Sequence, residues 1–150
     1  YIYPLDDPRT FVRDLAAGRV TKSDVKVSEL ACLPDGSLLV LERVTLSTHI
    51  YLIRLEDALA VPACFLDPRH RPTLEQIGQA GVETDGIPLL SKQLIVSTDE
   101  QTEICGDLEG MLIFDDGSML LANDSDYGIE GAVTQFWRIS LPETVMQPNR

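Results

Sequence analysis

The chain has 150 residues, and 44% of them are hydrophobic, which is enough apolar material for one compact unit. Its 24 acidic and 12 basic residues give a formal net charge of -12, which repels the phosphate backbone of nucleic acids. No stretch of about 18 apolar residues is present. The composition therefore predicts no nucleic-acid partner and no membrane span.

The chain begins with Tyr1-Ile2-Tyr3-Pro4-Leu5, which we expect to be a strand. No hairpin partner lies nearby in the sequence, so this strand is expected to belong with chain that precedes residue 1. Residues 7–18 fit either a short helix or an extended connection.

A β-hairpin is predicted next along the chain. Two apolar runs, residues 27–33 and 37–41, flank the turn dipeptide Asp35-Gly36. A third strand is expected over residues 50–55, which are rich in aromatic and β-branched side chains.

The middle of the chain contains a helix signal at residues 72–77. Thr73 and Gln76 have the spacing of a capping box, and Gly81 can end the helix. A helix of about two turns should lie on the surface of a β domain. Residues 92–97 are predicted to form an additional strand.

A second hairpin repeats the first. Residues 111–114 and 118–122 are apolar runs on either side of Asp116-Gly117, and a strand is expected over residues 133–139. The Asp-Gly turns at positions 35 and 116 lie 81 residues apart. The chain therefore contains an internal repeat of three successive strands.

The repeat predicts the fold class. Both alternating faces of residues 38–41 are apolar, which suits a strand covered on both sides by stacked sheets. A propeller supplies this environment, although a sandwich satisfies the same pattern. The repeat exceeds the usual blade of about 40–50 residues, so we expect an insertion or part of another blade within it. We predict an all-β fold, an antiparallel β-propeller segment of two to three blades with a short surface helix.

Two or three blades cannot close a ring. We therefore expect the chain to pair with the remainder of the propeller or with another copy of itself.

Polar residues gather where the apolar strands end. These residues are Glu29, Glu42, Arg43, Asp107, Glu109, Asn123, Asp124 and Asp126. In a propeller the strand ends of successive blades converge on one rim, so residues that are distant in the sequence can become neighbours.

Five of these residues suggest a calcium site. Asp107 and Glu109 enter the first strand of the second hairpin, while Asn123, Asp124 and Asp126 follow its second strand. Antiparallel pairing brings this entrance and exit together. Carboxylate and amide oxygens suit Ca²⁺, and we therefore predict that these five residues surround this ion. The alternative is a turn that is held by its own side-chain to backbone hydrogen bonds.

The catalytic candidates are Glu29, Glu42, Arg43 and Glu109. Glu29 and Glu109 open equivalent strands and could form an acid–base pair if their pKa values were driven apart. Glu42 and Arg43 are adjacent on a strand and should point to opposite faces. Arg43 could bind phosphate or carboxylate with its planar donors. Alternatively, Arg43 seals a buried carboxylate between two blades.

The cysteines and histidines predict no further chemistry. Cys32, Cys64 and Cys105 include no C-x-x-C pair, and neither His49 nor His70 lies in a recognisable nucleophile signature.

Four segments, in their order and spacing, resemble the conserved blocks of the esterase-like phytase family: residues 26–30, 39–43, 107–111 and 121–128. The similarity covers about residues 1–141. It implies a β-propeller, of which residues 1–150 are the C-terminal part, in bacterial proteins that are exported to the periplasm or secreted. The family name implies hydrolysis of phosphate or carboxylic esters.

Two functions are compatible with these observations. The first is a metal-assisted ester or phosphoester hydrolase, in which calcium polarises the ester and Arg43 holds an anionic group. The second is a non-catalytic propeller that binds a ligand or a protein at its rim. The net charge of -12 disfavours a highly phosphorylated substrate unless bound calcium inverts the local potential.

Overall fold

The computed structural model describes residues 1–55, 60–79 and 87–146. The chain divides into two compact units. The smaller contains Tyr1–Pro4 and Leu55–Ser91, and the larger contains Leu5–Arg54 and Lys92–Arg150. Both sheets lie in the larger unit, and Leu55–Ser91 of the smaller unit falls within the long repeat, where the sequence predicted an insertion or part of another blade.

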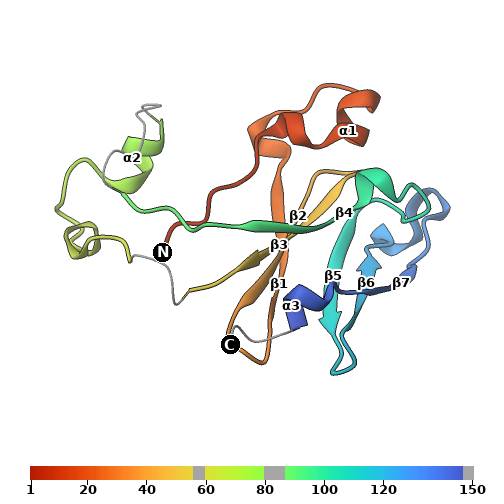
Figure 1. The fold of residues 1–150 in the computed structure, drawn as a ribbon. Coiled ribbons are helices and arrows are strands. Elements are labelled where there is room, and N and C mark those ends of the chain that lie inside the picture. Colours follow the sequence, from red (N-terminus) through yellow and green to blue (C-terminus); the bar gives the residue numbers. More distant parts are fainter. Residues whose placement is uncertain (56–59, 80–86, 147–150) are drawn as a thin grey trace. The chain divides into compact units, whose positions relative to one another are not determined.

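The larger unit contains two antiparallel sheets (Figure 1). The first has the order β1-β2-β3-β4, with β1 at Lys26–Cys32, β2 at Leu38–Arg43, β3 at Thr48–Ile53 and β4 at Gln93–Ser97. The second has the order β5-β6-β7, with β5 at Leu108–Ile113, β6 at Ser118–Asn123 and β7 at Phe136–Ser140. The prediction of mainly antiparallel β structure is confirmed.

The helices are short. The α-helices are α1 at Val12–Ala17, α2 at Leu74–Gln79 and α3 at Glu143–Met146, and single 3-10 turns lie at Pro8–Thr10, Lys22–Asp24, Ala63–Leu66, Thr98–Glu100 and Asp126–Gly131. Within the described residues, no helix has the length and apolar character needed to span a bilayer.

The two predicted hairpin turns are confirmed and have matching hydrogen bonds. The Asp35 carboxylate accepts the backbone N–H of Ser37 at 2.9 Å, and the Asp116 carboxylate accepts that of Ser118 at 3.0 Å. The glycine that follows each aspartate has a positive φ, 84° at Gly36 and 79° at Gly117. Such a φ is unfavourable for residues with a Cβ, and glycine therefore fits the turn.

A β-bulge also recurs in both sheets. The register shifts between Val27 and Glu29 in β1 and between Leu108 and Gly110 in β5. The extra residues are therefore Ser28 and Glu109, which are 81 positions apart, like the turns. A bulge re-aims the side chain at the extra position.

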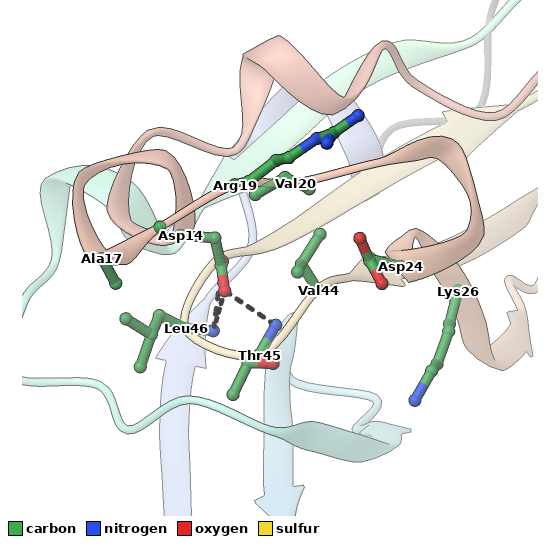
Figure 2. A pocket seen from close by; sticks show the side chains of 10 residues that line it. Asp14, Ala17, Arg19, Val20, Asp24, Lys26, Val44, Thr45 and Leu46 are labelled. Atoms are coloured by element: carbon green, nitrogen blue, oxygen red, sulfur yellow. Dashed lines mark hydrogen bonds between the residues drawn. The ribbon is translucent and has the colours of Figure 1, made fainter.

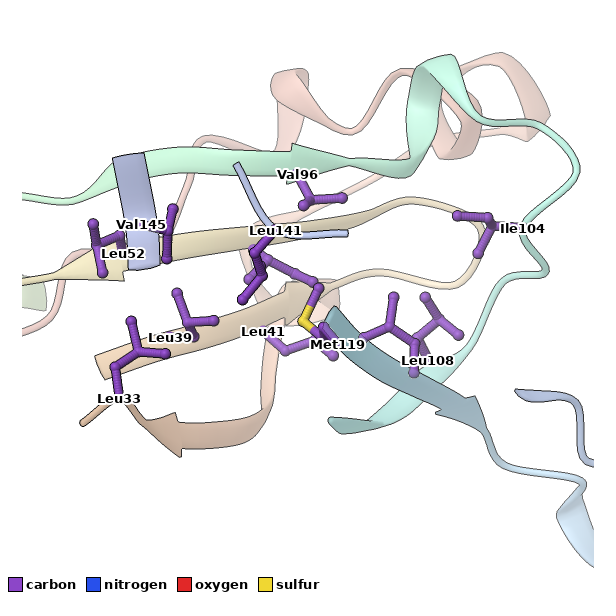
Figure 3. Packing of buried hydrophobic residues seen from close by; sticks show 12 residues of the cluster. Leu33, Leu39, Leu41, Leu52, Val96, Ile104, Leu108, Met119, Leu141 and Val145 are labelled. Atoms are coloured by element: carbon purple, nitrogen blue, oxygen red, sulfur yellow. The ribbon is translucent and has the colours of Figure 1, made fainter. Parts of the chain in front are cut away.

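The hydrophobic core joins the two sheets (Figure 3). Leu39 and Leu41 of β2 are fully buried, as are Met119 and Leu121 of β6. On β7, Trp137 packs against the same cluster. One face of the first sheet thus packs on one face of the second.

Two of the local predictions have different outcomes. The capping box is confirmed, because Thr73 N–H donates to Gln76 Oε1 at 2.9 Å and Gln76 N–H donates to Thr73 Oγ1 at 3.3 Å. Gly81 lies outside the described residues. The predicted strand at residues 1–5 is wrong: this segment forms a coil in which Ile2 O accepts the N–H of Leu90 at 2.8 Å.

Candidate functional site

Arg43 is the centre of the first polar cluster, at the end of β2. Its side chain is only 5% exposed. The guanidinium donates to Ser28 Oγ from Nε and to Val44 O from Nη1, both at 2.9 Å. It also donates to the carboxylates of Asp107 and Glu109. We call Arg43, Ser28, Asp107 and Glu109 the Arg43 cluster.

The two bulges build this cluster. Ser28 and Glu109 are the extra residues of β1 and β5, and both contact the same guanidinium. Arg43 therefore joins the first sheet to the entry of the second sheet. Glu29 and Glu109 lie on equivalent strands, as predicted, but the counterpart of Glu109 in the repeat is Ser28.

A close backbone crossing positions Asp107. Its N–H donates to Thr45 O at 2.6 Å, and its φ is 57°. A Cβ on Gly106 would lie 2.3 Å from the same carbonyl oxygen, closer than atoms can approach. Only glycine therefore fits at position 106. The dipeptide Gly106-Asp107 is the local signal for this backbone crossing, and sequence reasoning missed it.

The charges in the Arg43 cluster are partly compensated. One buried guanidinium faces two carboxylates, and the Asp107 and Glu109 side chains remain 34% and 41% exposed. A buried guanidinium needs such partners, since an unpaired buried charge is costly. Arg43 thus lies at a junction between sheets, as in the alternative of a buried carboxylate sealed between two blades, but the carboxylates that it contacts are partly exposed.

The other catalytic candidates lie elsewhere. Glu29 is half-buried, and its Oε1 accepts the N–H of Leu30 at 2.9 Å. Glu42 points to the face of β2 opposite Arg43, as predicted, and its side chain is fully buried. The structure thus separates Glu42 from Arg43 and brings Arg43 together with Glu109.

The predicted calcium residues do meet at one end of the second sheet. Leu108 pairs with Asn123, and Asp124 N–H donates to Asp107 O at 3.3 Å. The expected proximity of strand entrance and exit is therefore confirmed.

The side chains after β6 form turn contacts. Asn123 Oδ1 accepts the N–H of Gln135 at 2.6 Å, and Asp124 Oδ1 accepts the N–H of Asp126 at 3.1 Å. Across the described ranges, no group of three or more His, Cys, Asp or Glu residues has a geometry that could hold a metal ion. Calcium binding by Asp107, Glu109, Asn123, Asp124 and Asp126 stays a prediction.

A second polar cluster, which sequence reasoning missed, lies on the other face of the first sheet. Its members come from the N-terminal segment, β2, β3 and the ends of β4: Asp6, Glu42, His49, Tyr51, Lys92 and Asp99. We call these six residues the Lys92 cluster. The cross-strand pair of Glu42 and His49, two polar residues in apolar strands, is the one local signal for it.

Lys92 forms ion pairs with two acidic residues of this cluster, Asp6 and Glu42. Its Nζ lies 2.7 Å from Asp6 Oδ1 and also donates to Glu42. The same ammonium group lies 4.1 Å from the centre of the Tyr51 ring, a cation–π geometry. Asp6 N–H donates to Glu42 Oε2 at 2.9 Å. The N-terminal segment is therefore fastened to β2 by hydrogen bonds and charge.

His49 lies between two carboxylates. Its Nδ1 is 3.2 Å from Asp6 Oδ2, and its Nε2 is 3.1 Å from Asp99 Oδ2. The ring also stacks on Phe11, with centroids 4.5 Å apart. Only a doubly protonated imidazole can donate to both carboxylates at once. The His49 side chain is 4% exposed, so it is closed to a substrate.

The surroundings shift the pKa values in the Lys92 cluster. Burial alone would raise the pKa of Asp6, but hydrogen bonds from Lys92, Tyr51 and His49 outweigh burial and lower it. The pKa of Asp99 is lowered in the same way, mainly by hydrogen bonds from Ser47 and His49. Burial and the hydrogen bond to Asp6 raise the pKa of Tyr51. These shifts keep the carboxylates ionised and the phenol neutral.

Asp14 holds the loop between β2 and β3 (Figure 2). Its carboxylate accepts the backbone N–H groups of Thr45, Leu46 and Ser47 at 2.7–3.1 Å. Beside it lies a cavity of about 460 Å³. Arg19, Lys26 and Asp24 also line this cavity. Its lining thus contains two acidic and two basic side chains, counting Asp14.

Comparisons with protein-family models, with curated proteins and with solved structures find no match for this chain. Its function is therefore argued from the site alone.

Proposed function

We propose that the chain forms two consecutive blades of a β-propeller that resembles the esterase-like phytase family, and that it acts as a non-catalytic binding module. The observation that carries this proposal is the engagement of Arg43, whose buried guanidinium binds Asp107 and Glu109 across the junction of the sheets. An arginine that binds both carboxylates in this way holds the two sheets together. It is not available to hold the anionic part of an ester.

The packing of the two sheets supports the propeller. Leu39 and Leu41 lie on one face of β2, and the side chains that they meet include Met119 and Leu121 on β6. Because the sheets are built on the same repeat, this contact joins one face of a unit to the opposite face of the next unit. Successive blades of a propeller stack in this way.

The ligand that best fits the exposed end of the Arg43 cluster is positively charged. Asp107 and Glu109 keep exposed sides, and the exposed Asp124 is linked to Asp107 through its backbone. Two carboxylates thus contact one guanidinium, a third acidic residue is adjacent in the chain pairing, and the whole chain has a net charge of -12. Such a surface attracts basic ligands and repels anionic ones.

Titration with a tetralysine peptide tests this proposal. Binding should strengthen at low ionic strength and weaken about two- to fivefold in Asp124→Asn, as expected for one exposed charge pair. Asp115→Asn removes an exposed charge near the opposite end of the hairpin and should leave binding unchanged. Equal affinities for the wild type and Asp124→Asn would refute this site.

The second candidate is the metal-assisted hydrolase, and a specific observation favours it. Asp107, Glu109 and Asp124 are acidic residues of different segments that meet at one end of a sheet with exposed sides. A calcium ion there could polarise an ester oxygen. As in the family that the chain resembles, export to the periplasm or secretion belongs to this hypothesis.

Two measurements test the hydrolase. A panel of chromogenic phosphate and carboxylate esters, with and without calcium, should reveal turnover that is lost in Glu109→Gln. Thermal unfolding in millimolar calcium against excess EDTA should reveal a higher melting temperature with calcium, by linkage, and a smaller difference in Asp124→Ala. A wild-type protein with neither turnover nor a calcium-dependent melting temperature contradicts this candidate.

A further inference from the structure

One face of the second sheet is apolar and exposed. Leu112 of β5 and Phe136 of β7 are 54% and 66% exposed. Between them lie the half-buried Leu120 and Ala122 of β6, which pair with these residues across the strands. We call Leu112, Leu120, Ala122 and Phe136 the open face. Contiguous exposed apolar side chains of this kind mark an interaction surface.

The internal repeat indicates what such a face does. The counterparts of Leu112, Leu120 and Ala122 in the first sheet lie 81 positions earlier, and the counterpart of Phe136 occupies the matching pairing position on β3. These counterparts are Ala31, Leu39, Leu41 and Ile50. All four belong to the core or pack against it, where they meet the second sheet. In the first repeat, therefore, this same face is an interface.

The other side of that interface also has an exposed counterpart. Met111 and Ile113 of β5 pack against the core, and the residues 81 positions earlier are Leu30 and Cys32 of β1. Leu30 is 56% exposed, and Cys32 is exposed as well. We call Leu30 and Cys32 the β1 patch. The counterparts of Met119 and Leu121 of β6 are the half-buried Leu38 and the buried Val40, so the exposed part of this side is the β1 patch.

We propose that the open face of one copy docks on the β1 patch of a second copy, head to tail, and so repeats the part of the joint that Met111 and Ile113 of β5 form between the two sheets. The inference rests on the stacked arrangement of the proposed function. The two surfaces differ from each other, so the contact is heterologous and leaves a free face at each end of a dimer.

Two physical features define the strength of this contact. The open face consists of four side chains on three short strands, fewer than the roughly 20–30 residues per side of a standard interface, and association is therefore weak. Each copy has a net charge of -12, so long-range repulsion opposes the apolar contact. Salt screens that repulsion, and association strengthens as ionic strength rises.

Sedimentation equilibrium of the whole chain over a range of protein and salt concentrations tests the proposal. The wild type should associate progressively, with a larger mean mass at higher salt. The variants Leu112→Asp with Phe136→Asp, and separately Leu30→Asp, should each be monomeric. Phe136→Ser provides an uncharged second variant of the open face, which should also reduce association. Leu66→Asp changes a side chain that is 81% exposed in the smaller unit, and this control should associate like the wild type.

Mixing the variants distinguishes the modes of association. A head-to-tail contact predicts that the open-face variant and Leu30→Asp, each monomeric alone, form dimers together and nothing larger. If Leu30→Asp associates like the wild type, the contact joins two open faces and the proposal is overturned. A wild type that stays monomeric at high salt also overturns it. Neither result affects tetralysine binding, which tests the proposed function separately.

Discussion

The two sheets are built from the same local sequence, yet their environments differ. Both contain an Asp-Gly turn with the same side-chain hydrogen bonds, and both have a bulge in the first strand. The burial of equivalent leucines differs between the two sheets: Leu39 is fully buried, whereas Leu120 is half-buried. A repeated hairpin therefore specifies local geometry, while the neighbours of each copy decide how much burial stabilises it.

The surroundings of the polar residues at the ends of β2 and β6 also differ between the two sheets. Glu42 and Asn123 occupy matching positions, 81 residues apart. Glu42 is buried and receives Lys92 and the backbone of Asp6, whereas Asn123 closes a turn with Gln135. The same position is thus part of an ionic network in one sheet and of a loop in the other.

Loss of Lys92 should have the largest effect. Lys92→Met removes the ammonium group from Glu42, which is fully buried, and from Asp6. Breaking a buried pair typically costs about 3–5 kcal/mol of unfolding free energy. Urea unfolding measures this loss. The matched change in the second sheet, Arg138→Met, affects a surface pair with Asp116 and should cost less than about 1 kcal/mol. Similar losses for both variants would contradict the comparison.

Truncation of the matching leucines gives the next largest effect. Leu39→Ala should lower the free energy of unfolding by about 2–5 kcal/mol, since it leaves a cavity between the sheets. Leu120→Ala should cost about 1 kcal/mol or less, because its side chain lies on the open face. Thermal unfolding of the two variants, measured side by side, checks this difference. If Leu120→Ala is as damaging as Leu39→Ala, the open face is covered in solution.

Acid should destabilise the first sheet through Asp6 and Asp99. Both pKa values are lowered in the folded state, so these groups bind fewer protons when folded than when unfolded. Their contribution to stability is complete above the ordinary carboxyl pKa of about 4 and is lost as the pH falls through the lowered values. Urea unfolding from pH 7 to pH 3 measures the loss.

The control for the acid effect is Asp6→Asn, which cannot ionise at position 6. Its stability should be lower than that of the wild type at pH 7 and should decline less between pH 5 and pH 3. A parallel decline in both proteins would assign the acid sensitivity to other groups.

The smallest effect should be nearly equal in both sheets, with a slightly larger loss at Asp116, which also pairs with Arg138 at the surface. Asp35→Ala and Asp116→Ala each remove a carboxylate that accepts a backbone N–H and a serine hydroxyl in the turn. Each variant should lose about 1 kcal/mol of unfolding free energy. Chemical unfolding of the two variants checks this near-equality. A loss confined to Asp35→Ala would mean that the second turn does not stabilise its hairpin.

Local signals account for the parts of the fold that the sequence predicted. The Asp-Gly turns, the capping box of α2 and the repeat were readable because their hydrogen bonds join residues that are two or three positions apart. The prediction of a strand at residues 1–5 failed because apolar and aromatic composition does not specify a pairing partner, and the partner that Ile2 has, Leu90, lies 88 residues away.

The candidate site was predicted in part. Arg43, Asp107 and Glu109 were identified as polar residues at strand ends, and the structure joins them across separations of 64 and 66 residues. The Lys92 cluster was not predicted, since the hydrogen bonds and ion pairs that join its segments span 36–86 residues. The sequence by itself determined the hairpins, their bulge-forming strands and the acidic strand ends. The tertiary structure decided which charges are buried and paired, because the cost of burying a charge depends on the neighbours that the whole fold supplies.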